Sequence, residues 1–186
     1  MATFGAVNNT TVENVETSFA VRFSGGTLPV AGTLTEFHVW LQSGFPGTES
    51  WRLAVYQGGS ATDPSGATLI WDSGQLNVNI SASAWTTATT MGATPSGSLA
   101  AAYTWLMVKL NDGQIALNES DRGDFDSGSY RSTAVSGDAS VAYPATWPSD
   151  TTHTGAEAIK AFITYTEGGG GATLRKNSLM RLNVGR

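Results

Sequence analysis

The chain has 186 residues, no cysteine, 22 glycines and a charged fraction of only 13%. This length is typical of one domain with a core of its own. The absence of cysteine excludes disulfides, thiol catalysis and cysteine-ligated metal sites. Because charged residues usually make up about a quarter of a globular protein, the low fraction predicts a surface of hydroxyl groups and small side chains.

Short apolar runs separated by turn-forming residues recur along the chain, as is typical of strands. The expected strands are 18–23, 33–42, 51–57, 68–71, 75–80, 85–90, 103–110, 114–118, 130–133 and 158–166. Within 33–42 the side chains alternate, so that Phe37, Val39 and Leu41 share one face. The opposite face carries Glu36, His38 and Trp40. Residues 98–102 are expected to form one helical turn, and no other stretch before the tail has a convincing helical pattern.

The run 103–110 is the most apolar, with large side chains on both faces, and we expect it to be a central strand. Trp51, Trp71 and Trp105 lie on such strands and are expected in the core. Eight to ten short strands predict an all-β fold, a two-sheet antiparallel β-sandwich. We choose a jelly-roll-like strand order over an immunoglobulin-like one, with a concanavalin-like sandwich as the runner-up.

Residues 119–149 form a long segment rich in Ser, Gly and Asp. Long loops on a rigid scaffold often carry binding sites. Trp147 lies near two prolines and is expected to be the most exposed tryptophan. Together with Tyr143 it is a possible glycan-binding pair, because aromatic faces stack on sugars. Packing of both rings against the body is the favoured alternative.

The chain lacks the residue patterns of the common catalytic and metal sites. Its two histidines, His38 and His153, belong to no zinc-ligand or nucleophile motif. Glu36 and Glu49 are strand-associated acids, but their spacing does not single them out as a glycosidase pair. The acidic run from Asp121 to Asp126 offers the oxygen ligands that calcium prefers, without EF-hand spacing. We favour a solvated loop there, and we predict no enzyme activity, cofactor or metal.

Three stretches carry a resemblance to a known type of module, namely 31–42, 51–74 and 101–113. They resemble a β-sandwich module of bacterial surface and secreted proteins and of phage particles. Such modules pair an "LYxxxxGxPGxLL" hairpin with a later "aGxxYWlxV" strand. In this chain the PG is replaced by Pro64-Ser65-Gly66, and Thr104 separates the tyrosine from the tryptophan. The resemblance covers about residues 20–166 and implies a jelly-roll-like fold with a structural or binding role.

The last twenty residues differ from the rest of the chain. We therefore divide the chain into a domain at 1–166 and a tail at 167–186. Four glycines at 168–171 lose too much entropy in regular structure, so they predict a flexible joint. Beyond it, apolar and basic residues are interleaved in a segment expected to dock on a partner: Leu174, Arg175, Lys176, Leu179, Met180, Arg181, Leu182, Val184 and Arg186. The alternatives are a disordered tail and a final strand added to the chain's own sheet.

The charge is divided between body and tail. All fifteen acidic residues lie at or before Glu167, and four of the ten basic residues lie in the last twelve positions. The acidic body argues against nucleic-acid binding, whereas the basic tail favours an acidic partner such as the body of another copy. The chain shows no signal-peptide pattern and no run of apolar residues long enough for a membrane helix.

These features predict a non-enzymatic structural protein of a phage virion, such as a capsid decoration, head-fibre or tail-associated protein. Its partners would be capsid or tail proteins of the particle, and we expect a homo-oligomer with a trimer favoured. The alternative is a carbohydrate-binding β-sandwich module that binds glycans, located outside the cell or at a cell surface. Neither hypothesis involves a membrane.

Overall fold

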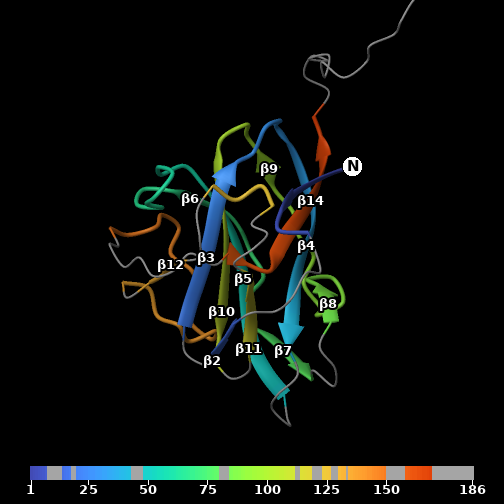
Figure 1. The fold of residues 1–186 in the computed structure, drawn as a ribbon, viewed down its shortest axis with the longest axis vertical. Coiled ribbons are helices and arrows are strands. Elements are labelled where there is room, and N and C mark those ends of the chain that lie inside the picture. The colour runs from blue at the N-terminus through green and yellow to red at the C-terminus, as the bar shows by residue number, and fades with distance from the viewer. Residues whose placement is uncertain are drawn as a thin grey trace, which may run out of the picture.

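The structure is a computed structural model that describes residues 1–7, 14–17, 20–42, 48–79, 84–111, 114–118, 123–126, 130–132, 134–149 and 158–168. Within these ranges the chain forms fourteen β-strands and no helix (Figure 1). The strands make two antiparallel sheets that pack face to face. The prediction of an all-β two-sheet sandwich is therefore confirmed.

Sheet A contains eight strands. Their bounds are β1 (Ala2–Gly5), β2 (Asn14–Thr17), β4 (Gly32–Gln42), β8 (Ala84–Thr87), β9 (Ser98–Leu99), β11 (Gln114–Asn118), β13 (Ala158–Ile159) and β14 (Ala161–Glu167). The strands pair in the order β1-β14-β4-β11-β13, while β2 pairs with β11, and β8 and β9 pair with β4. Strand β4 is the organising strand of this sheet, since four others pair with it.

Sheet B contains six strands. Their bounds are β3 (Ala20–Thr27), β5 (Thr48–Gln57), β6 (Thr68–Asp72), β7 (Leu76–Asn79), β10 (Tyr103–Leu110) and β12 (Tyr130–Arg131). They pair in the order β12-β3-β10-β5-β6, with β7 also on β5. Strand β10 is central, as its apolar sequence predicts, and it pairs with both β3 and β5 over nearly all of its length.

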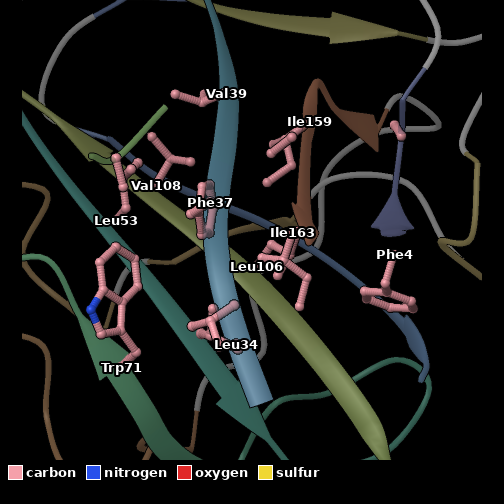
Figure 2. Close-up of a cluster of buried hydrophobic side chains, with 14 of the residues drawn as sticks. Phe4, Leu34, Phe37, Val39, Leu53, Trp71, Leu106, Val108, Ile159 and Ile163 are labelled. Carbon is pink, nitrogen blue, oxygen red and sulfur yellow. The ribbon is translucent and has the colours of Figure 1, made fainter. Parts of the chain in front are cut away.

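The main core fills the space between the two sheets (Figure 2). Phe37 and Val39 of β4 meet Leu53 of β5 and Leu106 and Val108 of β10, and all five side chains are fully buried. The alternation of the sequence predicts this inward face. Burying one such side chain stabilises the fold by roughly 1.5–3 kcal/mol, so these strands account for much of the driving force for folding.

Strand β4 contains a β-bulge that the sequence pattern does not reveal. Glu36 pairs with Thr164 and Leu34 with Tyr165, so Thr35 is an extra residue in β4. One extra residue reverses the alternation of side chains along a strand. Leu34 and Phe37 therefore both face the core although they are three positions apart, and both are buried.

A second core lies on the outer face of sheet B, beneath residues 134–149. This segment follows the edge of β6: Trp147 N–H donates to Ala67 O (2.8 Å), and Leu69 N–H donates to Ala145 O (2.9 Å). The buried residues of this core come from sheet B, the turn before β6 and the segment itself: Val21, Phe23, Ala54, Tyr56, Ala67, Trp105, Met107, Val135, Tyr143 and Trp147. Sheet B is thus buried on both faces, which explains why β10 is apolar on both sides.

Several elements differ from the sequence-based expectation, among them β8, which ends at Thr87 although a strand to residue 90 was expected. Strands β1, β2 and β9 are too short or too irregular to show an alternating pattern, and they were not predicted. Residues 98–102 form β9 and a bend instead of a helical turn. The expected strand at 158–166 is interrupted at Lys160, so that β13 pairs with β11 and β14 pairs with β1 and β4.

Candidate functional site

Four ring side chains gather on the outer face of sheet A, and we call them the aromatic patch. They are His38 and Trp40 of β4, Trp85 of β8 and Phe162 of β14. Strand pairing brings them together, because Phe162 lies opposite His38 and Trp85 lies opposite Trp40. All four are only partly buried, in contrast to the tryptophans of the two cores.

The rings of the aromatic patch are held against one another. His38 stacks on Phe162 with ring centroids 4.1 Å apart and planes inclined by 7°. Trp85 meets Phe162 edge-on at 5.0 Å and meets Trp40 edge-on at 5.7 Å. Aromatic pairs of this kind contribute roughly 0.5–1.5 kcal/mol each beyond the area that they bury. The patch is therefore ordered before any ligand arrives, which lowers the entropy cost of binding.

One corner of the patch also carries polar groups. Lys160 Nζ lies 5.0 Å from the Trp40 ring centroid. Burial lowers the pKa of Lys160. Within the described residues, the buried indole Nε1 of Trp40 has no hydrogen-bond partner, which is rare for a buried polar group.

Glu36 and His38 lie next to the rings, but their environment is not that of a catalytic pair. The Glu36 carboxylate accepts hydrogen bonds from the backbone N–H groups of Phe37 (3.0 Å) and Thr89 (3.2 Å). It therefore holds the turn after β8 against β4. Burial lowers the pKa of His38 below its usual 6.5, and the nearby Glu36 charge opposes that effect. The imidazole is thus neutral at pH 7, and it acts as one more flat ring of the patch.

The other strand-associated acid, Glu49, is buried in sheet B. It is 1% exposed, and its Oε2 accepts a hydrogen bond from Trp51 Nε1 at 3.3 Å. A general acid or base must reach a bound substrate, whereas this carboxylate is enclosed by the protein. Glu49 is therefore a buried residue packed within the fold.

The two possible glycan-binding residues of the long loop lie in the second core. Trp147 is 1% exposed and Tyr143 is 4% exposed. The expectation that Trp147 is the most exposed tryptophan is wrong, because its ring packs edge-on against Phe23 and Tyr56, each at 5.3 Å. Packing against the body, the favoured alternative, is what the structure has. Neither ring presents a free face to a sugar.

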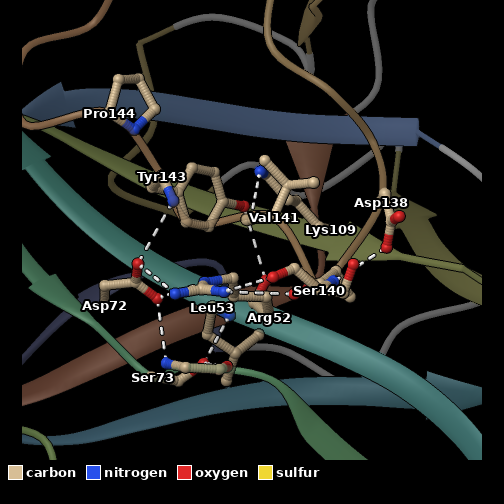
Figure 3. A network of polar contacts seen from close by, with 12 residues as sticks. Arg52, Leu53, Asp72, Ser73, Lys109, Asp138, Ser140, Val141, Tyr143 and Pro144 are labelled. Carbon is tan, nitrogen blue, oxygen red and sulfur yellow. Dashed lines mark hydrogen bonds and ion pairs between the residues drawn. The ribbon is translucent and has the colours of Figure 1, made fainter.

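A polar network beneath the loop fixes the segment 134–149 to sheet B (Figure 3). The Arg52 guanidinium donates two parallel hydrogen bonds to the Asp72 carboxylate, from Nε to Oδ1 at 2.6 Å and from Nη2 to Oδ2 at 2.9 Å. Arg52 also donates to the carbonyl oxygen of Ala139 (3.3 Å), and Tyr143 N–H donates to Asp72 Oδ2 (3.3 Å). Bidentate pairs of this kind fix geometry as well as charge, so the network is a clamp for the loop.

Lys109 belongs to the same region and has no exposed surface. Its Nζ donates to Val141 O at 3.0 Å and lies 4.3 Å from the centroid of the Tyr143 ring. Burial lowers the pKa of Lys109 to about 8, with a further lowering by Arg52 that Asp72 and Asp138 oppose. Folding therefore favours the neutral amine relative to the unfolded chain.

A measurable dependence of stability on pH follows from Lys109. Between the folded pKa of about 8 and the unfolded value of 10.5, the unfolded chain binds more protons. The Lys109 contribution to unfolding free energy must then rise with pH, by at most about 1.4 kcal/mol per pH unit. Urea unfolding of the wild type and of Lys109→Met at pH 7.5, 8.5 and 9.5 measures this. The unfolding free energy of the wild type minus that of Lys109→Met should increase as the pH rises. A difference that does not change with pH would contradict the prediction.

The remaining predicted sites lie wholly or partly outside the described residues. The docking residues 174–186 are outside them, so that docking stays a prediction. Asp121 is outside as well, while the carboxylate of Asp124 accepts a hydrogen bond from Gly5 N–H at 3.0 Å. Within the part of the chain that the structure describes, no three acidic or histidine side chains are grouped as metal ligands. In the same part no helix has the length and apolar character to cross a membrane.

Comparison with known protein families, with curated proteins and with solved structures finds no match to this chain.

Proposed function

We propose that the protein is a non-enzymatic structural component of a phage particle, in which the sandwich body is displayed and the tail attaches it. The observation that carries the proposal is how the long loop is held. Residues 134–149 are fixed to sheet B by a buried core and by the Arg52–Asp72 clamp, so the segment expected to carry a site forms a rigid cover. Such a body suits a protein that must persist on a particle surface.

The junction between body and tail also supports attachment through the tail. Strand β14 ends at Glu167, and the residues from Thr166 to Gly168 are exposed. The chain therefore leaves the body at the surface, where a following segment can reach a partner. The resemblance of residues 20–166 to modules of phage particles is the reason for proposing that the partner belongs to a phage particle.

Purified protein and purified particles provide the test. Light scattering of the full-length protein should give the mass of a symmetric oligomer, with a trimer favoured. Mass spectrometry of particles from the source culture should find the chain among the virion proteins. A strict monomer that is absent from particles would contradict the proposal.

A second candidate function, glycan binding, is favoured by the aromatic patch. Its partly exposed rings are the kind of surface that stacks on a sugar face, and Thr35, Thr87 and Thr164 place hydroxyl groups nearby on the same strands. This moves the glycan hypothesis from Tyr143 and Trp147 to the outer face of sheet A.

A glycan array tests the aromatic patch by comparing the wild type with one variant in the patch and one control variant outside it. A Trp85→Thr variant should lose at least tenfold in affinity for any glycan that the wild type binds, because one wall of the patch is removed. Tyr103→Phe alters a partly buried ring of sheet B and should bind as the wild type does. Thermal unfolding of both variants shows whether they remain folded. Equal binding by Trp85→Thr and the wild type would remove the patch from consideration.

A further inference from the structure

Strand β1 is an edge strand of sheet A, and its outer side is only partly occupied. Ala6 N–H donates to Ala161 O at 3.0 Å, which continues the hydrogen-bonded pairs between β1 and β14. Hydrogen-bonded pairs alternate along an antiparallel ladder, so the N–H and C=O groups of Thr3 and Gly5 point away from β14. This direction is where a further strand would add.

Of the residues that the structure describes, the segment 123–126 lies on the outer side of β1, and it pairs there with Gly5. Gly5 N–H donates to the Asp124 carboxylate, and Asp124 N–H donates to Gly5 O at 3.3 Å. Gly123 permits this approach, since a Cβ there would lie 2.2 Å from Gly5 O. Thr3 is exposed, and within the described residues its backbone N–H and C=O have no partner.

A half-open hollow of about 650 Å³ lies beside this free edge. Its apolar lining includes Met1 and Val7, which are 91% and 41% exposed. They are two of the three large apolar residues that are strongly exposed in the described part of the chain. Among the described residues, the charged side chains that line the hollow are Asp124 and Glu167, and both are acidic. The hollow therefore fits a segment that is apolar and basic.

The tail of this chain is such a segment, and its start lies next to the hollow. Residues 180–184, Met-Arg-Leu-Asn-Val, alternate apolar and polar with the period of a strand. Glu167 lines the hollow and is followed by Gly168, so residues 169–179 form the connection. At about 3.3 Å per residue this connection can extend to roughly 36 Å.

We propose that residues 180–184 add as a strand to the free edge of β1 at Thr3 and place their apolar side chains in the hollow. The occupant is the chain's own tail, because a connection of eleven residues, 169–179, keeps it at an effective concentration of about millimolar near this edge. Backbone pairing provides the affinity, and Asp124 and Glu167 attract the basic tail residues. Attachment to a particle through the tail would then require this strand to leave its own edge and pair with a partner, while the free protein keeps it on its own β1. This inference does not depend on the proposal that the protein belongs to a phage particle.

Cross-linking tests the contact directly, because the chain has no native cysteine. Full-length protein with Thr3→Cys and Asn183→Cys is treated with a short bis-maleimide. The control pairs Asn183→Cys with Ser136→Cys, an exposed position in the segment over sheet B. The proposal requires an intrachain product in at least tenfold higher yield from the Thr3 pair. Equal yields, or a product of doubled mass, would overturn it.

Hydrogen exchange of the unmodified full-length protein gives an independent measurement. The amide of Thr3 and alternate amides within residues 180–184, those that face β1, should exchange at least tenfold more slowly than unstructured amides. High salt should weaken that protection. Leu182→Asp should remove the protection at Thr3, whereas Leu174→Asp, outside the alternating segment, should leave it in place. Rapid exchange at Thr3 and 180–184 in the wild type would overturn the inference, whether or not the protein belongs to a particle.

Discussion

A Trp147→Ala variant is expected to lose about 3–5 kcal/mol of unfolding free energy, the usual cost of truncating a large buried aromatic side chain. The Trp147 ring fills the second core between Phe23 and Tyr56 and is 1% exposed. Urea unfolding followed by circular dichroism measures the loss. The truncation also leaves residues 134–149 without their largest anchor, so the loop should become accessible to proteases before the body unfolds.

The matched control is Val141→Ala in the same segment. Val141 is 47% exposed, so its truncation should change stability by no more than about 0.5 kcal/mol. A Trp147→Ala variant within about 1 kcal/mol of the wild type would contradict the burial of the ring. The result also decides how glycan assays are interpreted, since weaker binding by Trp147→Ala would report a damaged fold.

Side-chain alternation predicted most of the strands because both sheets have one face in the main core. Strand β10 was placed centrally from its two apolar faces. Phe37 and Val39 were predicted to share one face of β4, and the structure shows that this face is buried. In a regular strand, the alternation of apolar and polar side chains indicates which face is buried. The bulge at Thr35 breaks that period, so no pattern in the sequence could place Leu34 and Phe37 on the same face.

The aromatic patch was predictable only in part. From the sequence, His38 and Trp40 were placed together on the face of the strand opposite Phe37 and Val39. Trp85 and Phe162 join them because β8 and β14 pair with opposite edges of β4, and the order of strands in a sheet is a long-range property that local patterns do not contain.

Packing of the Trp147 ring against the body was the favoured prediction, but its expected rank as the most exposed tryptophan was wrong. Its flanking prolines and polar neighbours are typical of an exposed loop. The segment is nevertheless buried because the outer face of sheet B is apolar, and Met107 and Trp105 need a cover. The two apolar faces of 103–110 were the signal that could have indicated a third layer above the sheet.

An Asp72→Asn variant is expected to destabilise the protein by about 3–5 kcal/mol, because it leaves the Arg52 guanidinium buried without its counter-charge. The side chains of Arg52 and Asp72 are 11% and 15% exposed, so water screens the pair only weakly. The asparagine also weakens the acceptor for Tyr143 N–H. Amide exchange at Tyr143 should therefore accelerate more than exchange in β4, which lies in the other sheet.

A control and a double variant separate the ion pair from a general charge effect. Asp126→Asn removes the same charge at an exposed position and should change stability by no more than about 0.5 kcal/mol. Arg52→Met combined with Asp72→Leu removes both charges and should recover most of the loss, because neither partner is left unpaired. If Asp72→Asn unfolds at the same urea concentration as Asp126→Asn, the network does not hold the loop.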